Sequence, residues 1–72
     1  MRGQQTRLTP VYEEVVSGWV AGRILEVPAI ATAGRNREET ERMLRNELRE
    51  YLRFLREEGR PLPDGVPPNA RI

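Results

Sequence analysis

Residues Asn36–Gly59 read NREETERMLRNELREYLRFLREEG and predict one long helix with a cap at each end. Asn36 is a preferred N-cap residue, and Glu39 follows three positions later as the acidic half of a capping box. Gly59 favours a left-handed stop at the C-terminus, and Pro61 prevents continuation. At ~1.5 Å per residue the helix is roughly 33 Å long, about the width of a small domain.

This helix is amphipathic, so another layer of the protein must cover its apolar stripe. The stripe consists of Thr40, Leu44, Leu48, Tyr51, Leu52 and Leu55, with Met43 and Phe54 at its edges. The opposite face is charged, and three pairs at i, i+4 spacing can form ion pairs there. These pairs are Glu38–Arg42, Glu41–Arg45 and Arg53–Glu57.

The covering layer is predicted to be a sheet, because three segments rich in β-formers precede the helix. They are Arg7–Val16, Trp19–Val27 and Ala29–Ala33. Ser17 and Gly18 mark a tight hairpin turn, and Pro28 is expected to interrupt the chain between the second and third strands. The predicted fold class is α+β, with a three-stranded antiparallel sheet, one long helix across one face, and the order β-β-β-α.

The predicted domain organisation is a flexible N-terminus at 1–5, one α+β domain at 6–60 and a Pro-rich extended tail at 61–72. Four of the six prolines lie in this tail, which excludes a helix there. Whether Asn69–Ile72 add a short fourth strand is left open.

The composition argues against an enzyme. The 72 residues include no histidine and no cysteine, which removes the usual general base, the commonest metal ligand and thiolate chemistry. Glu13, Glu14 and Glu26 are carboxylates near one another in the sequence, but Glu13 and Glu14 point to opposite faces of a strand. We therefore expect no catalytic residues, no metal site and no cofactor.

No apolar run approaches the ~20 residues of a membrane span, and the first eight residues are too polar for a signal peptide. A cytoplasmic protein without membrane association is expected. The formal net charge is +1, which gives no general attraction to nucleic acid.

One surface of the helix nevertheless carries a row of arginines at i+3 and i+4 steps, which we call the arginine ridge. Its members are Arg42, Arg45, Arg49, Arg53 and Arg56. Such a row can follow phosphates. Glutamates at 38, 41, 50 and 57 interleave with it and no aromatic platform accompanies it, which favours a solvated, ion-paired face.

The first hairpin carries apolar side chains on both faces, with Val11 and Val15 on one face and Tyr12 and Val16 on the other. Because one helix covers only one face, the other needs a second copy of the chain or a partner protein. A homo-oligomer, most simply a dimer, is expected, by sheet-edge pairing or by face-to-face packing. Candidate partner-binding residues are Tyr12, Glu14, Trp19 and Glu26, with simple packing as the competing role of the two aromatics.

Several short motifs, taken in order, resemble the HicB family of bacterial antitoxins. They are Gly18–Ala21 (GWVA), Ile24–Pro28 (ILEVP), Thr32–Gly34 (TAG), Arg37–Glu39 (REE) and, around the end of the helix, Tyr51-Leu52 followed by Arg56–Pro63 (REEGRPLP). The resemblance covers roughly residues 8–63. Leu25 replaces a proline usual in that family, Ala29 replaces a glycine, and Arg35-Asn36 replaces Asp-Thr.

The resemblance implies a partial ribonuclease-H-like fold without catalytic carboxylates. It implies a partner, a small basic HicA-type toxin that cleaves messenger RNA, and neutralisation by occlusion of that toxin. The DNA-binding module found at the C-terminus of many family members has no counterpart here, so direct DNA binding is not expected. Two alternatives remain open: an orphan HicB-like dimer without a toxin, and a small nucleic-acid-binding module that uses the arginine ridge.

Overall fold

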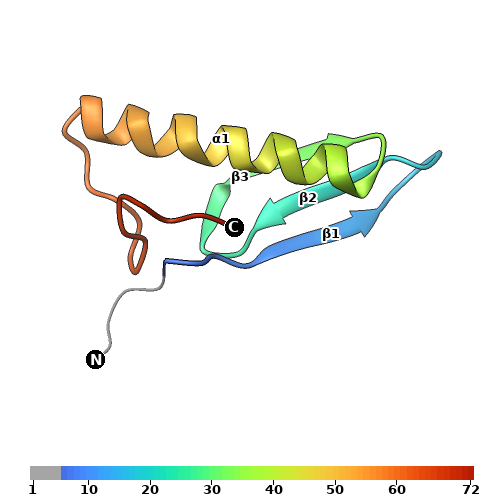
Figure 1. Ribbon diagram of the computed structural model, residues 1–72, viewed down its shortest axis with the longest axis horizontal. Helices are drawn as coiled ribbons and strands as arrows, with labels where there is room; N and C mark the ends of the chain where they lie inside the picture. Colours follow the sequence, from blue (N-terminus) through green and yellow to red (C-terminus); the bar gives the residue numbers. More distant parts are fainter. Residues whose placement is uncertain (1–5) are drawn as a thin grey trace.

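The structure, a computed structural model, describes residues 6–72, and the segment 1–5 expected to be flexible lies outside the described residues. Three antiparallel strands, β1 (Pro10–Glu14), β2 (Val20–Ile24) and β3 (Val27–Gly34), are followed by the helix α1 (Arg37–Glu57). The strands lie in sequence order, and α1 packs across one face of the sheet (Figure 1). The predicted α+β fold and its β-β-β-α order are confirmed.

The β1–β2 hairpin closes at the predicted turn. Ser17 and Gly18 have φ angles of 54° and 81°, and the Trp19 N–H donates to the Val16 carbonyl at 3.0 Å. Two consecutive left-handed residues match the right-handed twist of the flanking strands, which is why Gly is favoured there. The strands then pair from Glu14 opposite Val20 to Pro10 opposite Ile24.

The expected break at Pro28 does not occur, because β3 begins at Val27 and continues through this proline. The register between β2 and β3 shifts at this point: Ile24 lies opposite Val27, whereas Arg23 lies opposite Ala31. Residues 28–30 are extra residues on one strand, as in a bulge, and have no opposite residue in β2. Pro28 therefore costs no ladder hydrogen bond.

Both predicted helix caps are present. The Asn36 side chain accepts from the Glu39 N–H at 2.8 Å, and the Glu39 carboxylate accepts from the Arg35 N–H at 2.6 Å. At the other end Gly59 has φ 67°, and the Arg60 N–H donates to the Leu55 carbonyl at 2.8 Å. This six-to-one bond and the left-handed glycine form a Schellman stop.

The helix meets the sheet most closely at Thr40, whose side chain is fully buried. Its hydroxyl accepts from the Gly34 N–H of β3 at 2.9 Å and donates to the Val20 carbonyl of β2 at 2.7 Å. The hydroxyl also lies 3.0 Å from the Asn36 carbonyl at the start of α1. One side chain thus links two strands to the first turn of the helix.

Two glycines make room for Thr40. A Cβ atom on Gly22 would lie 2.5 Å from Thr40 Cγ2, and one on Gly34 would lie 2.9 Å from the Thr40 backbone nitrogen. Both distances are below any normal contact, so the close approach of helix and sheet needs residues without side chains at these positions.

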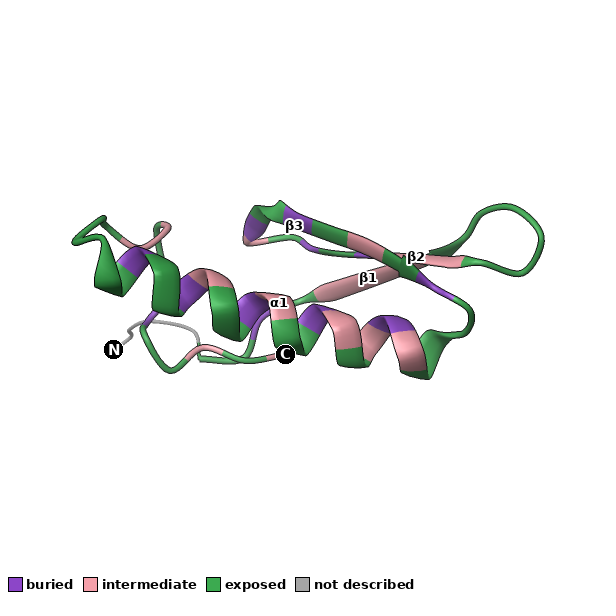
Figure 2. Ribbon diagram, turned by 90° about the horizontal axis from the view of Figure 1, so that it is seen from above, coloured by how far each residue is buried: buried purple, intermediate pink, exposed green. Residues whose placement is uncertain are grey.

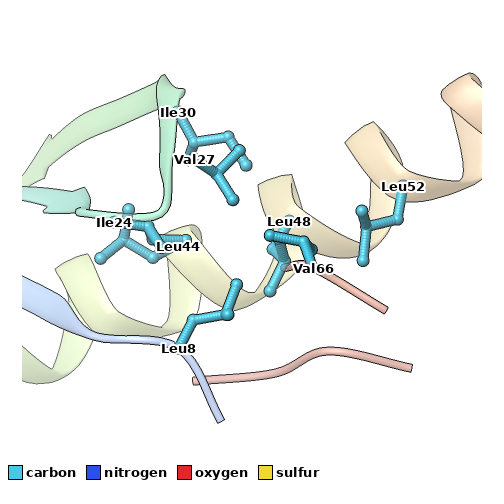
Figure 3. Packing of buried hydrophobic residues seen from close by; sticks show 8 residues of the cluster. All are labelled: Leu8, Ile24, Val27, Ile30, Leu44, Leu48, Leu52 and Val66. Carbon is cyan, nitrogen blue, oxygen red and sulfur yellow. The ribbon is translucent and has the colours of Figure 1, made fainter. Parts of the chain in front are cut away.

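The core lies between the sheet, α1 and the last segment of the chain. The buried stripe of α1 consists of Thr40, Leu44, Leu48, Leu52 and Leu55, as expected, and Tyr51 is half-buried beside it (Figure 2). Figure 3 shows Leu44, Leu48 and Leu52 grouped with Ile24, Val27, Ile30, Leu8 and Val66.

The tail folds back beneath the C-terminal half of α1 (Figure 1) and contributes Val66, which is 1% exposed, to the core. Two turns interrupt its extended course, with hydrogen bonds from Val66 N–H to the Pro63 carbonyl and from Ala70 N–H to the Pro67 carbonyl. Instead of a fourth strand, the tail forms one isolated parallel bridge, between Arg71 and Arg7.

We predict that Thr40→Val destabilises the protein by about 2–3 kcal/mol, because the isosteric side chain leaves the Gly34 N–H and the Val20 carbonyl without a partner. Thr40→Ser keeps the hydroxyl and should cost only about 1 kcal/mol for the lost methyl group. Urea unfolding followed by circular dichroism measures both. A Thr40→Val protein as stable as the parent would contradict the role of the hydroxyl.

We also predict that Gly22→Ala costs about 1–3 kcal/mol, since its methyl group collides with Thr40 Cγ2. In a Thr40→Ser background, where Cγ2 is absent, the same substitution should cost at least about 1 kcal/mol less. A double-mutant cycle of urea midpoints checks this coupling. Equal costs in the two backgrounds would show that the collision does not limit the packing.

Candidate interaction surface

One face of the sheet is left uncovered by α1. Gly22 contacts Thr40 and Leu44 of the helix, and the fully buried Ile24 points the same way. Because side chains alternate along a strand, the intervening residues and their cross-strand neighbours point away from the helix. We call this surface the open face; by the pairing register it comprises Val11, Glu13, Val15, Trp19, Ala21, Arg23, Ala31 and Ala33.

The open face is flat at its centre and apolar at the hairpin end. Ala21 and Ala33 are direct neighbours across β2 and β3, and Ala31 lies one row further. At the hairpin, Trp19 is 41% exposed and Val15 is 53% exposed. Large apolar side chains that remain exposed beside a flat sheet surface are typical of a surface that binds another protein.

The open face also carries charges of both signs. Glu13 and Arg23 are exposed, and neither forms an ion pair within residues 6–72. The Arg35 guanidinium lies 5.7 Å from the centroid of the Trp19 ring, within the range of a cation–π contact. Ser17 and Gly18 join these two residues around a shallow hollow of about 370 Å³.

Tyr12 and Glu14 lie on the opposite side of β1 from the open face, because they alternate with Val11 and Glu13. Tyr12 is half-buried against the helix layer, and the Arg37 guanidinium sits 4.5 Å from its ring centroid. Burial raises the pKa of the Tyr12 hydroxyl, with the Glu41 carboxylate adding to the effect. Tyr12 therefore has a packing role, and one flat partner surface cannot contact both Tyr12 and Trp19.

Glu26 lies in the β2–β3 turn, at the opposite end of the sheet from Trp19. Its carboxylate accepts from the Thr9 N–H at 2.9 Å and from the Thr9 hydroxyl at 2.8 Å. Burial acts to raise the pKa of Glu26, but the hydrogen bonds from Thr9 and from its own backbone outweigh it, so the pKa lies below its ordinary value. These hydrogen bonds hold Thr9, the residue that precedes β1, against the β2–β3 turn.

The carboxylates that the sequence analysis considered, Glu13, Glu14 and Glu26, do not form a metal-binding cluster. In the described part of the chain, no three side chains of the metal-ligating types lie close enough together to hold an ion. No helix among the same residues has the length and the apolar character needed to cross a bilayer.

The arginine ridge is exposed along α1, and glutamates neutralise part of it. Arg45 pairs with Glu41 as predicted, whereas Arg53 pairs with Glu50 at 2.8 Å instead of with Glu57. The predicted pair of Glu38 with Arg42 does not form between these two described residues.

No family model, no curated protein and no solved structure matches this chain. The resemblance to the HicB family accordingly rests on the order of its short motifs, and membership stays a prediction. The four candidate partner-binding residues likewise stay predictions, although the structure separates them: Trp19 lies on the open face, and Tyr12, Glu14 and Glu26 do not.

The row of alanines on the open face was not singled out in the sequence. The alternation of side chains along β2 could have indicated it. If Gly22 faces the helix, then Ala21 and Arg23 face away from it, and so do their cross-strand partners Ala33 and Ala31. That assignment needed the contact with Thr40, which the sequence does not reveal.

We predict that the stabilising contribution of Glu26 depends on pH. Because its folded pKa is lowered, the contribution is fully present above the unfolded value of 4.5 and disappears as the pH falls through the folded pKa. The stability difference between the parent and Glu26→Gln should be largest above about pH 5 and shrink below pH 4. Urea unfolding from pH 3 to 6 measures it.

Thr9→Val, which removes the hydroxyl donor and keeps the backbone donor, should retain part of this dependence. A constant difference between the parent and Glu26→Gln across the whole pH range would contradict the assignment.

Proposed function

We propose that this chain is a protein-interaction domain of the antitoxin type, which neutralises a small, basic HicA-type ribonuclease by binding and covering it. The observation that carries the proposal is the open face, a sheet surface with Trp19 and Val15 exposed and no layer upon it within residues 6–72. The motif resemblance supports the same reading. The chain acts by binding and not by catalysis.

The open face offers one carboxylate to a basic partner. Glu13 is exposed there and forms no ion pair within residues 6–72, so it can pair with a cationic side chain of the partner. Charge complementarity of this kind favours the right partner and suppresses wrong ones. Trp19 supplies the aromatic anchor that dominates many interfaces.

A second candidate, the orphan dimer, uses the same surface. Glu13 and Arg23 on the open face form no ion pair within residues 6–72, so two copies related by a two-fold axis can exchange ion pairs between these residues. Light scattering of the purified chain distinguishes a stable dimer from a monomer that awaits another protein.

The experiment uses inhibition of RNA cleavage as its readout. The tagged chain is isolated from its native cells, and any small basic protein bound to it is separated under denaturing conditions, refolded and assayed on messenger RNA. We expect that protein to cleave RNA and the added parent chain to inhibit it. Trp19→Ala should weaken inhibition about 30-fold, the effect of losing an interface hot spot of ~2 kcal/mol.

Phe54→Ala is the matched control, because Phe54 is an exposed aromatic residue of α1, 48% exposed and outside the open face. It should inhibit like the parent. Equal loss in both variants, or a bound protein without RNA-cleaving activity, would refute the antitoxin proposal.

A further inference from the structure

A groove of about 450 Å³ runs between α1 and the returning tail, away from the open face. Four arginines of the ridge line its helix side, namely Arg45, Arg49, Arg53 and Arg56, and Arg71 lines it from the tail. Five arginines from two segments far apart in the sequence thus line one hollow. The tail turns the ridge from an exposed helix face into one wall of a groove.

The groove carries an excess of positive charge. Glu41 and Glu50 neutralise two of its arginines, and Arg49 donates to the neutral side-chain oxygen of Asn46, at 3.1 Å. Arg49, Arg56 and Arg71 form no ion pair with any carboxylate of residues 6–72. Three of the lining arginines therefore have no counter-charge in the described part of the chain, although the whole chain carries only +1.

The floor of the groove is apolar. Leu48 and Leu52 line it from the helix, and Ala70 and the half-buried Ile72 line it from the tail. A second hollow of about 180 Å³ shares Leu52, Arg56 and Pro68 with the first and reaches Leu62. The groove therefore continues along the side of the helix, basic at its rim and apolar beneath.

We propose that this groove binds an extended acidic peptide segment of a partner protein, with an apolar side chain on the floor and carboxylates on either side of it. Planar guanidinium groups hold carboxylates through paired hydrogen bonds. Arg49, Arg53 and Arg56 advance along the helix by roughly 6 Å and 4.5 Å. Carboxylates on alternate residues of an extended peptide lie about 7 Å apart, which long arginine side chains can match.

The lining favours a peptide over single-stranded nucleic acid. Sequence-tolerant nucleic-acid grooves combine cations with aromatic rings on which bases stack. No aromatic residue is among those that line either hollow in the described chain. Aliphatic side chains beneath a basic rim match a peptide that alternates acidic and apolar residues.

This inference does not depend on the antitoxin proposal, since the groove and the open face are separate surfaces. The test uses a fluorescein-labelled peptide with the core Glu-Leu-Glu-Leu-Glu and measures its binding to the full chain by fluorescence anisotropy in 50 mM salt. Each of Arg49→Gln, Arg56→Gln and Arg71→Gln should weaken binding about threefold, as expected for partly exposed ion pairs. The triple variant should weaken it about 20-fold or more.

Arg23→Gln, which makes the same change of charge on the open face, is the matched control and should bind the peptide as the parent does. A peptide with Gln in place of Glu should not bind, and one with Ser in place of Leu should bind about tenfold more weakly. Circular dichroism confirms that each variant is folded.

Three outcomes would overturn the proposal. The peptide could bind the triple variant as tightly as the parent, or lose as much affinity with Arg23→Gln as with a groove variant. The Ser peptide could bind as well as the Leu peptide, which would remove the role of the apolar floor. A ten-nucleotide single-stranded RNA could bind more tightly than the peptide and lose binding in the triple variant, which would assign the groove to nucleic acid.

Discussion

The hydroxyl of Thr40 is the contact on which the arrangement of the two layers depends. It accepts a hydrogen bond from the Gly34 N–H and donates one to the Val20 carbonyl, so a helix side chain completes the hydrogen bonding of two strands. A buried hydroxyl in this position has to be held closely, and Gly22 and Gly34 provide the space. The same contact commits α1 to one face of the sheet and so decides which face is left open.

A mismatch in length explains the second feature of the molecule. The 21 residues of α1 span roughly 31 Å, whereas the five residues of β1 or β2 span about 17 Å. The C-terminal half of the helix therefore extends past β1 and β2, and its leucines need another cover. The tail returns beneath this half of the helix (Figure 1) and supplies that cover with Val66, which lies in the core, and Leu62, which packs against it. The groove lies between α1 and the tail, because the tail covers the leucines of the helix and leaves the adjacent arginine ridge exposed.

The features that could be predicted from the sequence are those that depend on interactions between residues close together in the chain. Asn36, Glu39 and Gly59 act within a few residues of the backbone groups that they satisfy, so the helix and its ends could be assigned from spacing alone. The path of the tail could not, because Val66 is buried only through its contacts with the distant helix. The candidate site shows the same division: Trp19 could be named as an anchor, but its separation from Tyr12 required the register of β1 and β2.

The net charge of +1 conceals an uneven distribution of charge. Arg49, Arg56 and Arg71, which have no ion-pair partner among residues 6–72, line the groove between α1 and the tail, whereas the open face carries Glu13 and Arg23, one charge of each sign. At physiological ionic strength exposed charges act over about 8 Å, which is far less than the length of the helix. The two surfaces are therefore electrostatically independent, and a partner senses the local charge instead of the total. A chain of this size can accordingly offer an aromatic surface with charges of both signs to one protein and a basic groove to an acidic segment without either site weakening the other.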